Sequence, residues 1–430
     1  MNEMAAIERD MLTGLPGRAA SLARLDEWLA GSGPPVHAMV LSLGRFETVN
    51  LAFGEAAGDG ALAEIARRLV HFAEDEFELS NWIAARLGGG KFLLALREEC
   101  TRERWQWLGE ALADAVALPI AAVEADVSLR LWPRIALIRA AGGEDAQAVL
   151  DRLAEALGQM KGDPGRRITW IDRSHVPIGI SGAQLEADLI GAMARNEIEL
   201  RFQPQYSLPD DRLVGAEALA RWNHPALGQI GAGTLFAIAQ LADQTSALSR
   251  HVAERALEHA GRWPEAMKLS LNVTPSDVAA AGFASEFLAL VAKTGLDPSR
   301  LTLEITEQVL LGDVDAAAKV LARLDAAGIA IALDDFGAGF CNFRYLKVLP
   351  LRLLKLDRAM VDGIADDPRD VEVLKAIIAM ARALDLTVVA EGIDSADKRT
   401  IAEREGCAIY QGFLKSRPIR PDDFLTLSRR

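Results

Sequence analysis

Cysteine and long hydrophobic runs are both scarce in this chain of 430 residues. Its three cysteines, Cys100, Cys341 and Cys407, are odd in number and have no paired-thiol spacing, which favours a reducing compartment. No apolar run approaches the roughly 18 residues of a membrane span. The stretch Met1–Thr13 is polar and acidic, whereas a secretory signal is basic and then apolar. We therefore expect a cytoplasmic protein with no membrane segment in this chain.

Basic residues are outnumbered, with 47 Lys and Arg against 61 Asp and Glu and a net charge of −14. This balance disfavours sequence-independent binding to a nucleic acid polymer or to anionic lipid. The six histidines show no ligand spacing, which argues against a histidine-based metal centre. An anionic ligand would therefore need a local positive charge.

The length predicts two domains, because single compact domains usually have 100 to 200 residues. Half of the residues are hydrophobic and a quarter charged, as in ordinary globular proteins. Breaker residues cluster at 161–167, and a Pro- and Gly-containing connector follows a last short apolar run. We place the domains at residues 1–173 and 181–430, with a linker at 174–180.

The first part mixes strand-like runs with amphipathic helices, which predicts a smaller α/β domain. The predicted strands are Ala38–Leu43, Phe92–Leu96, Leu129–Leu137 and Ile168–Ile171, and the predicted helices are Trp105–Leu118 and Ala146–Leu157.

The second part alternates short apolar runs with helical stretches of 10 to 15 residues, a pattern that predicts strand-helix units. Eight such units over 250 residues are typical of a (β/α)₈ barrel, which is the predicted fold. The runs are Glu199–Phe202, Leu213–Ala216, Lys268–Leu271, Leu301–Leu303, Ala330–Leu333, Leu351–Leu354, Thr387–Ala390 and Ala408–Tyr410.

A polar residue follows every one of these runs. Any single one is more often a helix cap or a solvated loop residue, but eight in order make that explanation poor. In a barrel, the carboxyl ends of the strands open onto one mouth, where these side chains would meet. They are Gln203, Glu217, Asn272, Glu304, Asp334 with Asp335, Lys355, Glu391 and Gln411.

Five clustered carboxylates need positive charge, because like charges raise each other's pKa and resist burial. Oxygen donors without nearby Cys or His favour Mg²⁺ or Mn²⁺ over Zn²⁺. Two such ions could hold the attacking water and the leaving oxygen of a phosphodiester. The pattern therefore indicates metal-dependent phosphodiester hydrolysis.

The segment Glu217-Ala-Leu-Ala-Arg221 resembles the E-A-L-x-R signature of the EAL family of cyclic di-GMP phosphodiesterases. The resemblance continues in family order across residues 181–430. It includes Gln203-Pro204, Leu271-Asn272-Val-Thr-Pro, Glu304-Ile-Thr306-Glu307, Asp334-Asp335-Phe-Gly, Lys355-Leu-Asp357, Glu391-Gly and Gln411-Gly-Phe.

This resemblance implies a modified TIM barrel, working as a homodimer, that hydrolyses cyclic di-GMP to linear pGpG with two Mg²⁺ or Mn²⁺ ions. By resemblance, Lys355 and Glu391 position and deprotonate the attacking water, and Gln411 orients water or metal. The implied metal ligands are Glu217, Asn272, Glu304, Asp334 and Asp335. The implied substrate contacts are Gln203, Leu219 and Arg221, and the supporting residues are Thr306, Glu307 and Asp357.

Four positions depart from the family pattern without removing an implied ligand. They are Gln240 and Asp394, where the family commonly has Glu, and Ala338 and Phe340 in the loop after Asp335-Phe-Gly. The departures put rate and regulation in question more than activity.

The segment Asp10–Arg18 resembles the D-x-L-T-G-L-P-N-R opening of GGDEF domains, which make cyclic di-GMP from GTP. The continuation is degenerate, because Ser42 replaces a metal-binding aspartate and Gly90 with Lys91 replaces the acidic pair of the signature. We therefore expect no diguanylate cyclase activity. Residues 79–82 read Leu-Ser-Asn-Trp, so the inhibitory R-x-x-D motif is absent as well.

A GTP pocket could survive in this domain and regulate the barrel, since Asn50 and Asp59 fall where the family reads guanine and Lys161 near its phosphate contacts. Lys91 has two readings, a solvated turn lysine or a cation near nucleotide phosphates.

Three functions remain open on the sequence. The first is a metal-dependent cyclic di-GMP phosphodiesterase with an inactive GGDEF-like regulator. The second is a non-catalytic cyclic di-GMP receptor or scaffold that signals through a protein partner. The intact Glu217, Asp334, Lys355 and Glu391 argue against it. The third is a barrel phosphohydrolase for another nucleotide.

Overall fold

The computed structural model describes residues 9–44, 46–77, 81–121, 128–160, 167–171, 182–306, 309, 313–337 and 343–429. They form two compact units. One unit is Met1–Gln184 together with His224–Thr234, and the other is Leu185–Asn223 together with Leu235–Arg430. The predicted linker at 174–180 lies outside the described residues, so that boundary stays a prediction.

The first unit has a five-stranded sheet in the order β2-β3-β1-β6-β7. β1 pairs antiparallel with β3 and β6, and β7 joins β6 in parallel. The strands are β1 (Val36–Gly44), β2 (Asn81–Gly88), β3 (Lys91–Arg97), β6 (Trp132–Ala140) and β7 (Ile168–Trp170), with a separate ribbon of β4 (Ile120–Ala121) and β5 (Ser128–Leu129).

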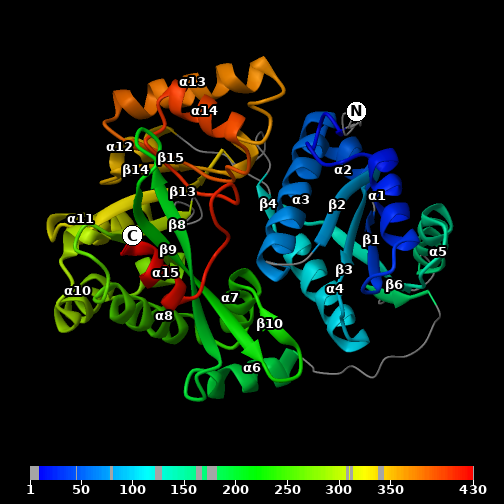
Figure 1. The fold of residues 1–430 in the computed structure, drawn as a ribbon, viewed down its shortest axis with the longest axis horizontal. Coiled ribbons are helices and arrows are strands. Elements are labelled where there is room, and N and C mark those ends of the chain that lie inside the picture. The colour runs from blue at the N-terminus through cyan, green and yellow to red at the C-terminus, as the bar shows by residue number, and fades with distance from the viewer. Residues whose placement is uncertain are drawn as a thin grey trace. The chain divides into compact units, whose positions relative to one another are not determined.

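Helices cover both faces of this sheet (Figure 1). α1 and α5 lie on one face, where their apolar side chains share a core with alternate residues of β1 such as Ala38 and Val40. α3 and α4 lie on the other face. The helices are α1 (Arg18–Ala30), α2 (Phe46–Phe53), α3 (Glu55–Glu76), α4 (Arg102–Ala117) and α5 (Ala146–Gln159). The mixed α/β domain predicted from the sequence is confirmed.

Eight strands close the barrel of the second unit, in the order β9-β11-β12-β13-β14-β15-β16-β8, with β8 returning to β9. A short strand, β10 (Gly228–Ile230), lies in the segment His224–Thr234 of the first unit. The eight are β8 (Ile198–Ser207), β9 (Leu213–His224), β11 (Lys268–Val273), β12 (Leu301–Thr306), β13 (Ala330–Phe336), β14 (Leu353–Leu356), β15 (Thr387–Ala390) and β16 (Ile409–Tyr410).

The predicted barrel is confirmed, with one difference in strand direction. β8 runs antiparallel to both of its neighbours, β9 and β16, whereas the other pairings within the barrel are parallel. β8 and β9 form a hairpin, which brings Gln203 directly opposite Glu217. The mouth of the barrel therefore receives Gln203 from β8, a strand that runs opposite to the other seven.

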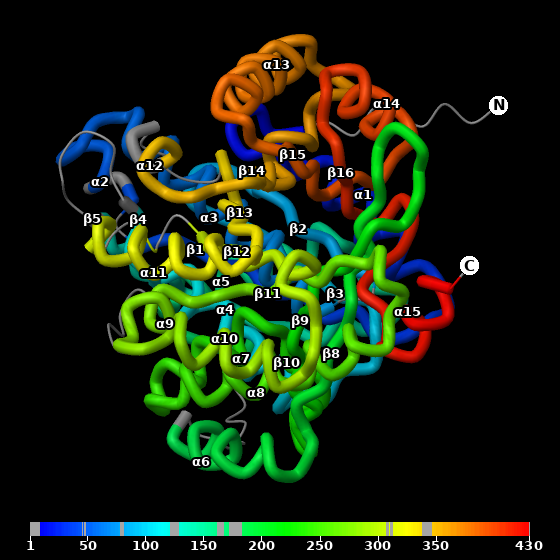
Figure 2. Tube along the Cα trace, turned by 90° about the vertical axis from the view of Figure 1, so that its left-hand side faces the viewer, coloured from blue at the N-terminus to red at the C-terminus, as the bar shows by residue number. Residues whose placement is uncertain are grey.

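Helices lie outside these strands, and Figure 2 shows β11 to β15 side by side in chain order. Most strands also run further than predicted, so that the polar residues expected after them, except Glu391 and Gln411, lie within strands. The helices are α6 (Gly182–Ala192), α7 (Ala232–Leu241), α8 (Thr245–Ala260), α9 (Pro275–Ala279), α10 (Phe283–Thr294), α11 (Val314–Ala326), α12 (Phe343–Val348), α13 (Pro368–Ala383), α14 (Ala396–Glu405) and α15 (Pro421–Ser428), with 3₁₀ turns η2 (Pro298–Arg300) and η4 (Arg358–Met360).

Among the described residues, no helix combines the length and apolar composition that crossing a bilayer requires. Cys100 and Cys407 are buried free thiols, and Cys341 lies outside the described residues.

Candidate active site

Lys355 lies at the centre of the acidic residues inside the barrel. Its side chain is only 2% exposed, and its Nζ is 2.6 Å from Glu304 Oε2 and 3.3 Å from Glu217 Oε2. The same nitrogen is 3.0 Å from Asp334 Oδ1 and 2.8 Å from Glu391 Oε1. One ammonium group therefore faces four carboxylates that come from four other strands or their ends.

The charge imbalance perturbs every member of this cluster. Burial lowers the pKa of Lys355, but the four carboxylates outweigh it and hold the pKa well above its usual value. Burial raises the pKa of Glu304 and Glu391 well above their usual range, and that of Asp334 to about 6. The Lys355 ammonium and the Gln411 and Asn272 amides overcome burial at Glu217, whose pKa is lowered.

These residues fit divalent cations. Glu217, Glu304 and Asp334 offer carboxylate oxygens within 4.8 Å of one another, and Asp334, Asp335 and Glu391 form a second such group. Asp334 belongs to both, as expected for two neighbouring ions that share a ligand. The donors are hard oxygens, which suit Mg²⁺ or Mn²⁺. Added positive charge would also let the carboxylates with raised pKa values ionise.

An irregularity in β13 places two consecutive aspartates at the site. The pairing of β13 with β14 shifts between Leu333 and Phe336, and Asp335 has a positive φ of 56°. The backbone N–H of Asp335 donates to Asp334 Oδ1 at 2.9 Å. In a regular strand, successive side chains point to opposite faces, and the irregularity removes that restriction.

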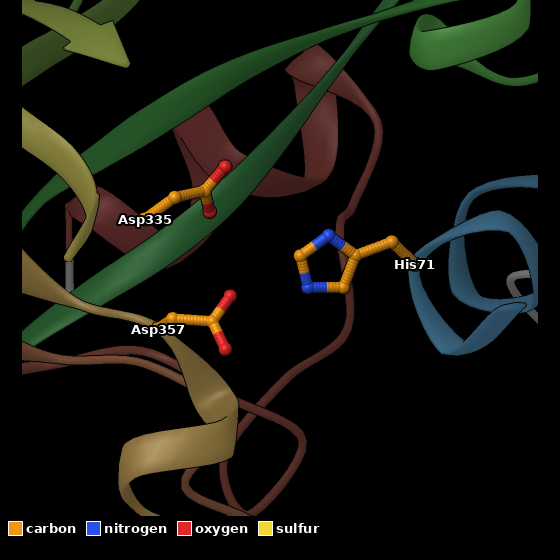
Figure 3. Close-up of side chains that lie close together, drawn as sticks. All are labelled: His71, Asp335 and Asp357. Atoms are coloured by element: carbon orange, nitrogen blue, oxygen red, sulfur yellow. The ribbon is translucent and has the colours of Figure 1, made fainter. Parts of the chain in front are cut away.

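Asp357 lies one strand further along, after β14, and its carboxylate has an oxygen within 4.8 Å of an Asp335 oxygen (Figure 3). It is fully buried and its Oδ1 accepts the N–H of Ala359 at 2.7 Å. Asp357 thus begins the turn η4, and its backbone N–H donates to the carbonyl of Phe336 at 3.1 Å.

β9 carries three of the predicted residues on one face, because Glu217, Leu219 and Arg221 are spaced by two. Arg221 is 2% exposed and donates to the carbonyl of Ala220 at 2.9 Å. Asn272, from β11, is exposed and donates to Glu217 Oε1 at 2.7 Å. Thr306 ends β12 in register with Asp334. The structure thus brings these residues to one end of the barrel.

Three glutamines line the side of the barrel closed by β8. Gln411 Nε2 donates to Glu217 Oε2 at 2.9 Å and to Glu391 Oε1 at 2.8 Å. Gln203 Nε2 donates to the carbonyl of Ser416 at 2.8 Å. Gln205, which sequence reasoning missed, donates to Gln411 Oε1 at 3.0 Å. Its spacing of two from Gln203 is the sequence signal that could have revealed it.

Glu307 and Lys161 lie outside the described residues, as do Ala338 and Phe340. In the first unit, Ser42 and Lys91 are directly opposite each other on β1 and β3, and Lys91 is exposed. Asn50 is partly buried on α2, and Asp59 is exposed on α3. The space beside Asn50 depends on Gly58, because a Cβ there would overlap the Asn50 amide.

The mouth of the barrel combines a buried lysine, two groups of carboxylates and several amide donors. This arrangement suits metal-assisted chemistry on an anionic substrate. The chain matches the EAL domain family over residues 186–418 and the family described as "Diguanylate cyclase, GGDEF domain" over residues 7–167. It belongs to the EAL domain family and carries an amino-terminal GGDEF domain.

Two curated relatives come from Pseudomonas aeruginosa. The bifunctional diguanylate cyclase/cyclic di-GMP phosphodiesterase MucR is 29% identical over 424 residues, which cover 97% of this chain and 61% of MucR. The cyclic di-GMP phosphodiesterase NbdA is 30% identical over 427 residues, which cover 95% of this chain and 52% of NbdA. The chain thus spans between half and two thirds of the length of these relatives.

A solved structure of the PaMucR phosphodiesterase in complex with c-di-GMP superimposes with a TM-score of 0.54 and 33% identity. The superposition covers 56% of this chain and 100% of the PaMucR chain in that structure. This likeness agrees with the barrel and with the placement of the EAL match.

Proposed function

We propose that the chain hydrolyses cyclic di-GMP to linear pGpG at the barrel mouth. The observation that carries the proposal is the pair of carboxylate groups that share Asp334 around the buried Lys355. Such a cluster needs divalent cations, and two of them would also bind the phosphate of an anionic substrate in an acidic protein. The relatives named as cyclic di-GMP phosphodiesterases support this substrate.

Glu217, Asn272, Glu304, Asp334 and Asp335 would hold two Mg²⁺ or Mn²⁺ ions. Bound there, the ions would lower the pKa of a coordinated water and withdraw charge from the phosphate. The Glu391 carboxylate would accept the proton of the attacking water, with Lys355 fixing its orientation from 2.8 Å. Gln411, at the end of the neighbouring strand β16, would hold the same carboxylate.

Arg221 would bind a phosphate of the substrate, because a guanidinium suits bidentate phosphate contacts. Gln203 and Leu219 would line the same end of the barrel, one from β8 and one from β9. Thr306, Glu307 and Asp357 would support the ligands and the loop after Asp335.

The GGDEF domain would be a regulator without cyclase activity. Ser42, Gly90 and Lys91 stand where the resemblance expects metal-binding acids, so this part lacks carboxylates that would polarise a triphosphate. Asn50, Asp59 and Lys161 would bind GTP, and the bound nucleotide would change barrel activity. The active form would be a cytoplasmic homodimer formed through the barrel.

The test of hydrolysis is chromatography of cyclic di-GMP incubated with the full chain and Mg²⁺ or Mn²⁺. We expect pGpG with the intact chain and none with Glu217→Ala or excess chelator. Substrate that binds but stays intact would replace the phosphodiesterase by the receptor alternative. Hydrolysis of other cyclic dinucleotides at equal rates would favour the third, less specific hydrolase.

The regulatory part is tested by GTP. Incubation of the full chain with GTP and Mg²⁺ should yield no cyclic di-GMP, and titrated GTP should change kcat or KM for cyclic di-GMP hydrolysis. If GTP leaves both constants unchanged, the regulatory proposal fails and the hydrolytic one stands. The homodimer is tested by analytical ultracentrifugation of the full chain, where a molar mass of one chain would contradict it.

A further inference from the structure

Gln205 is a buried amide that contacts another amide of the site. It lies on β8, is 7% exposed, and its Nε2 donates to Gln411 Oε1 at 3.0 Å. Gln411 follows β16, and its own Nε2 donates to Glu217 and Glu391. The two glutamines therefore form a chain of hydrogen bonds that ends on two carboxylates.

Only one orientation of the Gln411 amide satisfies its neighbours. An amide has an NH₂ group with two donors and an oxygen that accepts. With the NH₂ group toward the carboxylates, both of its hydrogens are used and the oxygen faces the donor of Gln205. A flipped amide would place its oxygen against two acids. Gln205 stabilises the favourable orientation, because its Nε2 donates to the buried Gln411 Oε1 on the side away from the carboxylates.

This orientation also sets the position of Glu391. Its Oε1 accepts from Gln411 at 2.8 Å and from Lys355 at 2.8 Å. Two donors on one oxygen fix the plane of the carboxylate, so the other oxygen keeps a constant direction. A carboxylate that removes a proton from water depends on such fixed geometry.

We propose that Gln205 is a positioning residue for hydrolysis, which acts through the Gln411 amide to orient Glu391 and Glu217. This rests on the proposed phosphodiester hydrolysis at the same site. Gln205 does not itself touch the reacting atoms in this assignment, so its loss should reduce turnover and leave substrate affinity intact.

The test is a double-mutant cycle in the full chain. Gln205→Met keeps the length of the side chain and removes the donor, and it should lower kcat about tenfold with KM for cyclic di-GMP changed less than twofold. Gln411→Met should lower kcat further. In the Gln411→Met background, adding Gln205→Met should cost nothing more, because its target is gone.

Two controls separate positioning from a general structural effect. Gln184→Met makes the same change at an exposed position on α6 and should leave kcat unchanged. Thermal unfolding of Gln205→Met should show the same number of transitions as the parent chain, which establishes that kcat is compared between folded proteins. Multiplicative kcat losses in the double variant, or a raised KM with unchanged kcat, would overturn the assignment.

The same cycle remains decisive if the parent chain does not hydrolyse cyclic di-GMP, in which case the proposed function itself has failed. Calorimetric titration with Mn²⁺ alone then replaces kcat, because Gln411 holds the metal-site carboxylate of Glu217. Gln205→Met should weaken Mn²⁺ binding several-fold, and it should have no effect in the Gln411→Met background. Equal effects of Gln205→Met in both backgrounds would sink the inference.

Discussion

Lys355 is the residue on which the electrostatics of the site depend. Replacing it by Met removes the ammonium that faces four carboxylates and one of the two donors to Glu391 Oε1. We expect hydrolysis of cyclic di-GMP by Lys355→Met to fall at least about 100-fold, within the range usual for a lost group that handles protons. The measurement is kcat by pGpG formation, with Lys355→Arg beside it as a variant that keeps the charge and changes its geometry. Turnover of Lys355→Met within threefold of the parent chain would contradict the role.

His37 is a buried residue of the first unit whose titration affects the free energy of unfolding. It is fully buried on β1 against the Trp105 ring, with centroids 5.4 Å apart. Burial, with the charge of Arg139 in addition, lowers its pKa from 6.5 to about 4. Between these values the unfolded chain binds the proton and the folded chain does not, so stability rises with pH across this window. The contribution present above pH 6.5 and lost toward pH 4 is up to about 3 kcal/mol.

Urea unfolding of the full chain at pH 4.5, 5.5 and 6.5, followed by tryptophan fluorescence, measures this effect. His37→Leu should flatten the part of the pH dependence that His37 contributes, because Leu cannot bind the proton. The comparison uses the difference between variant and parent at each pH, which cancels the titration of all other groups. A difference that does not change with pH would exclude His37 as the cause.

Sequence reasoning reached most residues of the site but not the links between them. Polar residues in a regular order predicted that side chains such as Glu304 and Lys355 meet, because parallel strands end at one mouth. Gln205 was missed because an amide inside a strand resembles an ordinary alternating polar position. Its partner, Gln411, is 206 residues away in the sequence. Only the closure of the barrel makes the two neighbours.

At the scale of elements, a four-charge cluster joins the turn after β14 to the start of α14. Lys398 Nζ lies 2.8 Å from Asp362 Oδ1 and 3.0 Å from Asp394 Oδ1, and its side chain is 9% exposed. Arg358 contacts both aspartates at 3.2 and 3.7 Å, and its side chain packs against Gly392 so closely that a Cβ there would overlap it. The cluster therefore holds the loop that begins at Glu391.

Lys398→Met should loosen this loop and slow hydrolysis together. The change removes the nearest cation of two aspartates that are 33% and 39% exposed and still contact Arg358, so the loss should be about 1 kcal/mol, the upper end for such ion pairs. Hydrogen exchange of the 391–398 segment should speed up, and kcat should fall more than KM rises. The matched control is Lys375→Met on α13, where the lysine is 45% exposed and, within the described part of the chain, forms an ion pair with Glu372 alone. That variant should stay within about 0.5 kcal/mol of the parent. Equal effects of the two substitutions would show that the cluster has no special role.

Two element-scale features could not be predicted from the pattern used. Parallel strands need a crossover of a dozen residues or more, and β8 and β9 are joined by only residues 208–212. The predicted runs ended too early to show how short this connection is, and the antiparallel direction of β8 was therefore missed. The irregularity at Asp334 and Asp335 depends on tertiary pairing with β14, and a strand pattern of period two has no place for it.

At the scale of the whole molecule, the first unit is not one continuous stretch of sequence. It includes His224–Thr234, the segment that directly follows β9 in the chain. Within this unit, the amides of Ala232 and Gly233 donate to Asp75 at 2.9 and 2.6 Å, and Gly231 donates to Glu76 at 3.1 Å. Ala232 and Gly233 are the first residues of α7, and the first amides of a helix have no partner inside the helix. Acidic side chains at the end of α3 thus accept from three consecutive amides of the segment 224–234.

The consequence is a prediction about order in that segment. Asp75→Ala in the full chain removes the acceptors of two helix-terminal amides, and loss of such a cap typically costs about 1 kcal/mol. Hydrogen exchange should become faster at residues 231–234. Asp151→Ala, on α5, removes an aspartate that accepts only from the Gln147 side chain among the described contacts and should leave this segment unchanged. Unchanged exchange at residues 231–234 would show that Asp75 does not hold these amides.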